Sequence, residues 1–148
     1  MASWQFSCNL INNNAEFSFN QEERNILWGD FKLQVESIPK IERVLKPQKS
    51  WSVDIKQYGE LDSHCLEISF DKDRIEEISL RIDLRELNKD VFDEILDFIK
   101  SNNALILLQD GRIIEPEQGV LLNEIKKSDA YKYVSEPNNY LERFDLSK

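Results

Sequence analysis

The sequence has little of what several special classes of protein require. It has four glycines and four prolines in 148 residues, which excludes a collagen-like repeat and a Gly/Pro-rich linker between two domains. Its longest purely apolar run is 104–108, whereas a membrane helix needs about 20 apolar residues. We therefore expect one globular domain over residues 1–148, with no membrane partner.

Cysteine is also scarce, and the two cysteines, Cys8 and Cys65, form no CxxC motif. Free cysteine is common in reducing compartments, where it packs as a small apolar residue. We expect both thiols to be reduced and at least one to be buried. The first residues, 1–7, lack the basic and apolar regions of a secretory signal. These features predict a cytoplasmic, bacterial protein.

Basic residues are scarce relative to acidic ones, with 19 Lys and Arg against 28 Asp and Glu, giving a net charge of −9. Residues 1–50 are neutral, so residues 51–148 carry the whole excess. Nucleic-acid binders present basic surfaces to phosphate groups. The charge therefore argues against a nucleic-acid partner.

Alternating apolar and polar residues predict three consecutive strands in the middle of the chain, around 51–55, 66–70 and 78–84. A period of two places apolar side chains on one sheet face and charged ones on the other. Because the connections are short, the strands are expected to form an antiparallel meander with one packed and one wet face. The alternation places Trp51 and Val53 on the packed face. Core packing is the default expectation for Trp4, Trp28 and Trp51, although one of them can instead line a binding surface.

Other elements follow from turn and capping signals. They are a strand at 4–10, a strand at 16–19, a helix at 21–28, a helix at 39–45, strands at 105–108 and 113–114 joined by a turn at 110–111, a helix from 116, and a short helix beyond 137. The region after the helix at 21–28 is open to a second interpretation, because Phe31, Leu33 and Val35 alternate as in a strand.

Residues 89–101 are predicted to form an amphipathic helix with Asn88 as its N-cap. Six apolar residues share one face: Val91, Phe92, Ile95, Leu96, Phe98 and Ile99. Burying them contributes roughly 9–18 kcal/mol, and ordering the helix costs a comparable amount. The helix must therefore lie on the sheet. The predicted fold class is α+β, an antiparallel β-meander with amphipathic helices packed on one face.

The opposite side of this helix carries an acidic stripe with i, i+3, i+4, i+7 spacing. Its members are Asp90, Asp93, Glu94 and Asp97. Like charges at i, i+4 each cost a helix roughly 0.2–0.5 kcal/mol, and only Lys89 and Lys100 stand at the margin. Two interpretations remain open: a solvated face of an acidic protein, or a surface that binds a basic partner. We take the four acids as candidate partner-binding residues.

Catalytic and metal-binding signatures are missing. The sequence contains no HExxH, GxSxG, GxGxxG or P-loop pattern. The single histidine, His64, has no marked nucleophile partner and is expected to be a surface or hydrogen-bonded residue. The acidic segment 71–77 lacks the ligand and glycine positions of a calcium loop. We expect no cofactor, no metal and no enzymatic activity. The less favoured alternative is a small carboxylate and arginine site on the wet sheet face, built from Asp54, Arg81, Asp83 and Arg85.

Three segments follow one another along the chain: the strand 78–85 with its amphipathic helix, a Leu-rich strand with the turn segment 110–116, and the segment 125–131. This arrangement, within residues 51–135, resembles small bacterial immunity proteins of polymorphic toxin systems. The resemblance implies a non-enzymatic protein that binds and blocks a toxin domain, often a basic nuclease, and it carries over no individual functional residue. The alternative function is an accessory, chaperone or adaptor module for a secreted effector.

Overall fold

The chain forms an antiparallel sheet of seven strands with four helices, over the residues that the structure describes. The structure is a computed structural model and describes residues 2–13, 28 and 32–135. The strand order is β2-β3-β4-β5-β1-β6-β7. The strands are β1 (Gln5–Asn12), β2 (Pro47–Gln48), β3 (Ile55–Tyr58), β4 (Cys65–Asp71), β5 (Arg74–Asp83), β6 (Ala104–Leu108) and β7 (Ile113–Ile114).

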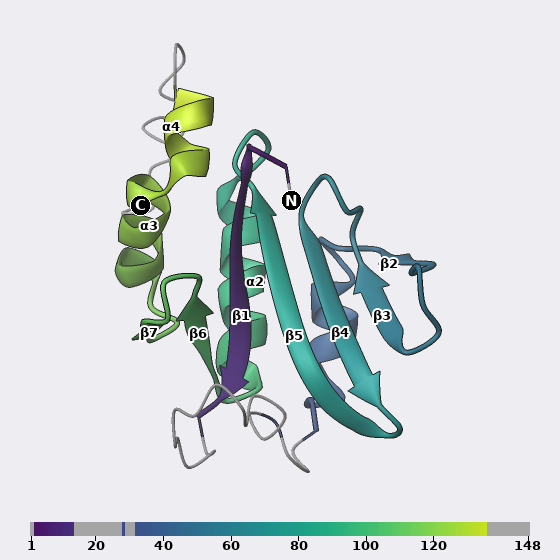
Figure 1. Cartoon of the computed structure of the whole chain (residues 1–148). Coiled ribbons are helices and arrows are strands. Elements are labelled where there is room, and N and C mark those ends of the chain that lie inside the picture. Colours follow the sequence, from purple (N-terminus) through teal and green to yellow (C-terminus); the bar gives the residue numbers. More distant parts are fainter. Residues whose placement is uncertain (1, 14–27, 29–31, 136–148) are drawn as a thin grey trace.

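The helices lie behind the sheet or beside it (Figure 1). They are α1 (Ser37–Ile41), α2 (Lys89–Ser101), α3 (Gln118–Lys127) and α4 (Asp129–Ser135). Figure 1 shows α1 and α2 behind the strands, and α3 and α4 on the side of β6 and β7. The predicted α+β class, with an antiparallel meander and helices on one face, is confirmed.

Strands β3, β4 and β5 form an antiparallel meander in which β4 and β5 lie where the sequence predicts them, and alternation along these strands separates the two faces of the sheet. Leu66 pairs with Leu80 and Ile68 with Ile78 on the packed face. Residues between them, such as Glu67 and its neighbours in register, therefore face the opposite side. The packed side holds the core, and the other side is left for polar groups.

The N-terminal strand β1 is central, between β5 and β6 (Figure 1). Its residues Phe6, Cys8 and Leu10 are buried in the core. Trp28 is 1% exposed and donates its indole N–H to the Leu10 carbonyl at 2.8 Å. The expected strand at 16–19, the rest of the expected helix at 21–28, and the expected helix beyond 137 lie outside the described residues.

Helix α2 has the predicted bounds, cap and buried face. The Asn88 side chain accepts the Val91 N–H at 2.9 Å, which satisfies a first-turn donor that has no partner within the helix. The helix ends before Asn103, whose φ of 52° is left-handed. Five of the six predicted apolar residues are fully buried, and Val91 is half-buried. Their burial fixes α2 on the packed face of the sheet.

The prediction of a strand over 51–55 is wrong, because β3 begins only at Ile55. The preceding loop, 49–54, is held by serine side chains. The Ser50 hydroxyl donates to the carbonyls of Ser52 and Ile55, and the Asp54 N–H donates to the Ser52 hydroxyl at 3.2 Å. Such local bonds compete with a strand ladder. Trp51 and Val53 therefore point away from the core.

Other elements differ from expectation near prolines and serines. The helix expected at 39–45 spans Ser37–Ile41, with Pro39 in the first turn, where a missing N–H costs nothing. β2 was not predicted, and it places Pro47 on an edge strand, where proline is tolerated. α4 was also not predicted, and the Ser128 hydroxyl accepts the Tyr131 N–H at its start.

Candidate functional site

The acidic stripe of α2 is on the surface, but it is partly neutralised. Lys89 Nζ lies 3.0 Å from Asp93 Oδ2, as its position at the margin allows. Lys40, on α1, lies 3.9 Å from Asp97 Oδ2. Lys100, the other marginal lysine, instead lies 4.0 Å from Glu117. The marginal lysine Lys89 therefore offsets Asp93, and a lysine of another helix, Lys40, pairs with Asp97.

The other two members of the stripe, Asp90 and Glu94, form no ion pair with the described residues. Asp90 is exposed and Glu94 is half-buried. Because they are four residues apart on one helix, their carboxylates share a surface. The ion pairs at Asp93 and Asp97 join half-exposed groups, and such pairs contribute little and exchange readily for other partners.

The sheet face opposite the core carries a second group of polar side chains. Strand pairing aligns Gln57, Glu67, Ser79 and Asn9 in one row across four strands. The Glu67 side chain is only 9% exposed, and Arg81 Nη2 lies 3.3 Å from its Oε1. This charged pair is satisfied within the sheet face.

Trp51 stands at the edge of this face. Its residue surface is 74% exposed, and its indole N–H donates to Glu67 Oε2 at 3.3 Å. Val53, in the same loop, is fully exposed. The packed-face expectation for Trp51 and Val53 is wrong, and the alternative that one tryptophan lies on an accessible surface applies to Trp51.

The four residues of the alternative catalytic site are not brought together. Asp83 is completely buried, and Arg85 holds its carboxylate at 2.9 Å. Arg81 and Arg85 both reach toward the backbone after β3, at Leu61 and Asp62. Asp54 lies before β3, at the other end of that strand. Arg81, Arg85 and Asp83 therefore join the end of β5 to the loop after β3, and they do not form a site together with Asp54.

His64 is buried and hydrogen-bonded, in agreement with the structural interpretation. Its Nδ1 accepts the Asp83 N–H at 3.0 Å, so the ring proton of the neutral form resides on Nε2, which lies 3.4 Å from the Glu86 carbonyl. Burial lowers the pKa of His64 below its usual value. The His64 ring thus stabilises the end of β5 by binding the backbone of Asp83.

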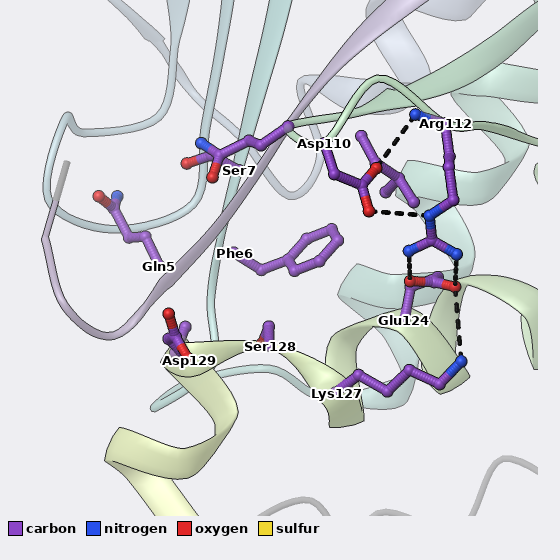
Figure 2. A pocket seen from close by; sticks show the side chains of 12 residues that line it. Gln5, Phe6, Ser7, Asp110, Arg112, Glu124, Lys127, Ser128 and Asp129 are labelled. Carbon is purple, nitrogen blue, oxygen red and sulfur yellow. Dashed lines mark hydrogen bonds and ion pairs between the residues drawn. The ribbon is translucent and has the colours of Figure 1, made fainter.

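A cleft of about 330 Å³ opens between the start of β1, the β6–β7 turn and the junction of α3 with α4 (Figure 2). Arg112 dominates one side and binds Glu124 through two N–H groups, at 3.0 and 2.7 Å. Asp110 Oδ2 accepts a third bond from the Arg112 side chain at 2.8 Å, and Asp110 Oδ1 accepts the Arg112 backbone N–H at 3.0 Å. The backbone N–H first, and then the guanidinium, hold the pKa of Asp110 below its usual range. These contacts join the β6–β7 turn to α3.

The cleft is lined by polar and charged side chains. Its lining contains no histidine or cysteine. The Ser128 hydroxyl donates to the Ile125 carbonyl at 2.6 Å and accepts the Tyr131 N–H at 3.2 Å, so it joins the end of α3 to the start of α4.

The cysteines are free and buried on different faces of the sheet, which confirms the thiol prediction. Burial raises the pKa of Cys8 to about 12 and that of Cys65 to about 11. Within the described ranges, no cluster of three or more His, Cys, Asp and Glu side chains is arranged to hold a metal ion. No helix in that part of the chain is long and apolar enough to cross a membrane.

Comparison with protein-family models, curated proteins and solved structures finds no match to this chain.

Proposed function

We propose that this chain is a non-enzymatic binding protein, an immunity protein that neutralises a basic toxin domain in the bacterial cytoplasm. The observation that supports this most is the acidic outer side of α2. There, four carboxylates share one stripe, and two of them, Asp90 and Glu94, have no ion-pair partner among the described residues. The sequence resemblance to immunity proteins points the same way.

A basic partner suits both the stripe and the net charge of −9. Complementary charge accelerates diffusional encounter and disfavours wrong partners. Binding exchanges the weak surface pairs of Asp93 and Asp97 for pairs that are shielded from water at the interface. The stripe thus offers four carboxylates to the partner at little cost to the free protein.

Co-expression tests the proposal. Each reading frame next to the gene of this chain is expressed in a bacterial host, alone and together with the chain. We expect one frame to stop growth alone and to be tolerated with the chain, and its product to co-purify with the chain. If none of the neighbouring products is toxic, or if the chain does not relieve the toxicity, the proposal is wrong.

A further inference from the structure

The sheet face opposite the core is not covered by any of the described helices, which lie behind the sheet or beside β6 and β7 (Figure 1). On this face Ser69 pairs with Glu77 and Ser79 pairs with Glu67, so small hydroxyl groups alternate with carboxylates. From the loop before β3, the Trp51 indole N–H donates to Glu67 Oε2. A polar surface thus lies next to one large aromatic ring.

The loop that carries Trp51 is ordered before any partner arrives. Besides the serine bonds described above, the Ile55 N–H donates to the Ser52 carbonyl at 3.2 Å. The indole N–H of Trp51 is held by Glu67, a carboxylate that Arg81 fixes from the other side. Immobilising a flexible side chain on binding costs roughly 0.5–1.5 kcal/mol. The loop avoids much of this cost while keeping the Trp51 ring and Val53 exposed.

The charges around the ring favour a cation. The loop and the outward positions of β4 and β5 beside it carry carboxylates at Asp54, Glu67 and Glu77 and cations at Lys49 and Arg81. Glu67 and Arg81 pair with each other, which leaves one more carboxylate than cations. The face of an indole ring also attracts ammonium and guanidinium groups. Trp51 further offers the type of side chain that dominates binding energy at protein interfaces.

We propose that the loop 49–54 and the adjoining open sheet face bind a segment of a partner protein that presents basic side chains next to apolar ones. An arginine or lysine of that segment stacks on Trp51, and an apolar side chain of the segment packs against Val53. The inference rests on the proposed function in one respect: it assumes that the partner is a basic protein. It adds a binding surface on the side of the sheet away from α2.

Titration of the full ¹⁵N-labelled chain by NMR tests this surface without any toxin. The probe is a short capped peptide of alternating arginine and leucine, and the control peptide alternates glutamate and leucine. We expect saturable shifts of the Trp51 indole resonance and of the 49–54 amides with the basic peptide, and none with the acidic one. Trp51→Ala is expected to weaken binding at least tenfold, and Val53→Ala to weaken it severalfold.

Val35→Ala is the matched control, because Val35 is also exposed but precedes α1, which lies behind the sheet. It is expected to leave the affinity within twofold. Shifts confined to α2, equal binding of both peptides, absence of any saturable shift, or an unchanged affinity of the Trp51→Ala variant would overturn the inference. A failed co-expression test would leave this titration unaffected, so the two proposals fail separately.

Discussion

The neutral form of His64 stabilises the end of β5. Its Nδ1 accepts the backbone N–H of Asp83, so protonation of Nδ1 removes this bond. Because its pKa is lower in the folded state than its unfolded value of about 6.5, the unfolded chain binds the proton more readily. The contribution of His64 to stability is therefore complete above about pH 6.5 and is lost as the pH falls through the folded pKa.

A pH series of unfolding measurements checks this contribution. We expect the free energy of unfolding to fall over an interval that begins at about pH 6.5 and lies above most carboxylate titration. In His64→Asn, an amide oxygen can accept the same N–H without titrating, so this part of the pH dependence should disappear. Equal slopes for the two proteins in that interval would show that His64 does not act in this way.

The two thiols should be unreactive in the folded protein. Cys8 and Cys65 are buried, and their raised pKa values keep them protonated at pH 8. A chromogenic disulfide reagent should modify neither thiol in buffer and both in denaturant. Rapid modification of the native chain, or an intact mass two hydrogens below the sequence mass without reductant, would contradict this account.

Among single residues, the sequence predicted those features that depend only on neighbouring residues in the chain. The Asn88 cap depends on neighbouring residues alone, and it could be predicted. The contacts of Lys40 with Asp97 and of Trp51 with Glu67 could not, because each joins parts of the chain that only the fold brings together. The half-neutralised stripe and the exposed tryptophan both follow from such contacts.

Among the elements, helix α2 has an N-cap that should contribute measurably to the free energy of unfolding. The Asn88 side chain accepts the Val91 N–H, and this donor has no partner within the helix. Asn88→Ala should lower the free energy of unfolding by about 1 kcal/mol. Chemical denaturation measures the change, and Asn88→Ser, which keeps a capping oxygen, should recover most of it. A loss below about 0.3 kcal/mol would mean that water replaces the cap.

Among the elements, the alternation of apolar and polar residues predicted two strands correctly and one wrongly. Alternation predicted β4 and β5, because Leu66, Ile68 and Ile78 are drawn to the core. The equally regular alternation at 51–55 is not a strand. Ser50 and Ser52 interrupt the ladder with their own hydrogen bonds, and a hydrophobicity pattern does not register that competition.

At the scale of the whole molecule, the sheet order depends on non-local pairing. β1 pairs with β5 and β6, which follow it after much of the chain, and no local signal in the sequence indicates these partners. The class of the fold could be predicted from patterns, whereas the position of β1 at its centre could not. This order leaves one face of the meander free of the described helices and places the α2 stripe on the opposite side of the sheet.

The central claim is that the α2 stripe meets a basic protein partner, and the association rate of the complex tests it most directly. Asp93→Lys combined with Asp97→Lys is compared with Glu60→Lys combined with Glu115→Lys, a control pair in exposed turns. Both changes move the net charge from −9 to −5, so they alter long-range attraction equally and differ in position alone. The partner is the toxic product found by co-expression, and circular dichroism verifies that both variants are folded.

The account predicts that the α2 variant associates at least tenfold more slowly than the unmodified chain at low salt, and that the gap narrows as salt screens the charges. The control pair should slow association only slightly. An α2 variant whose association rate equals that of the control pair at every salt concentration would contradict the claim that this stripe meets the partner.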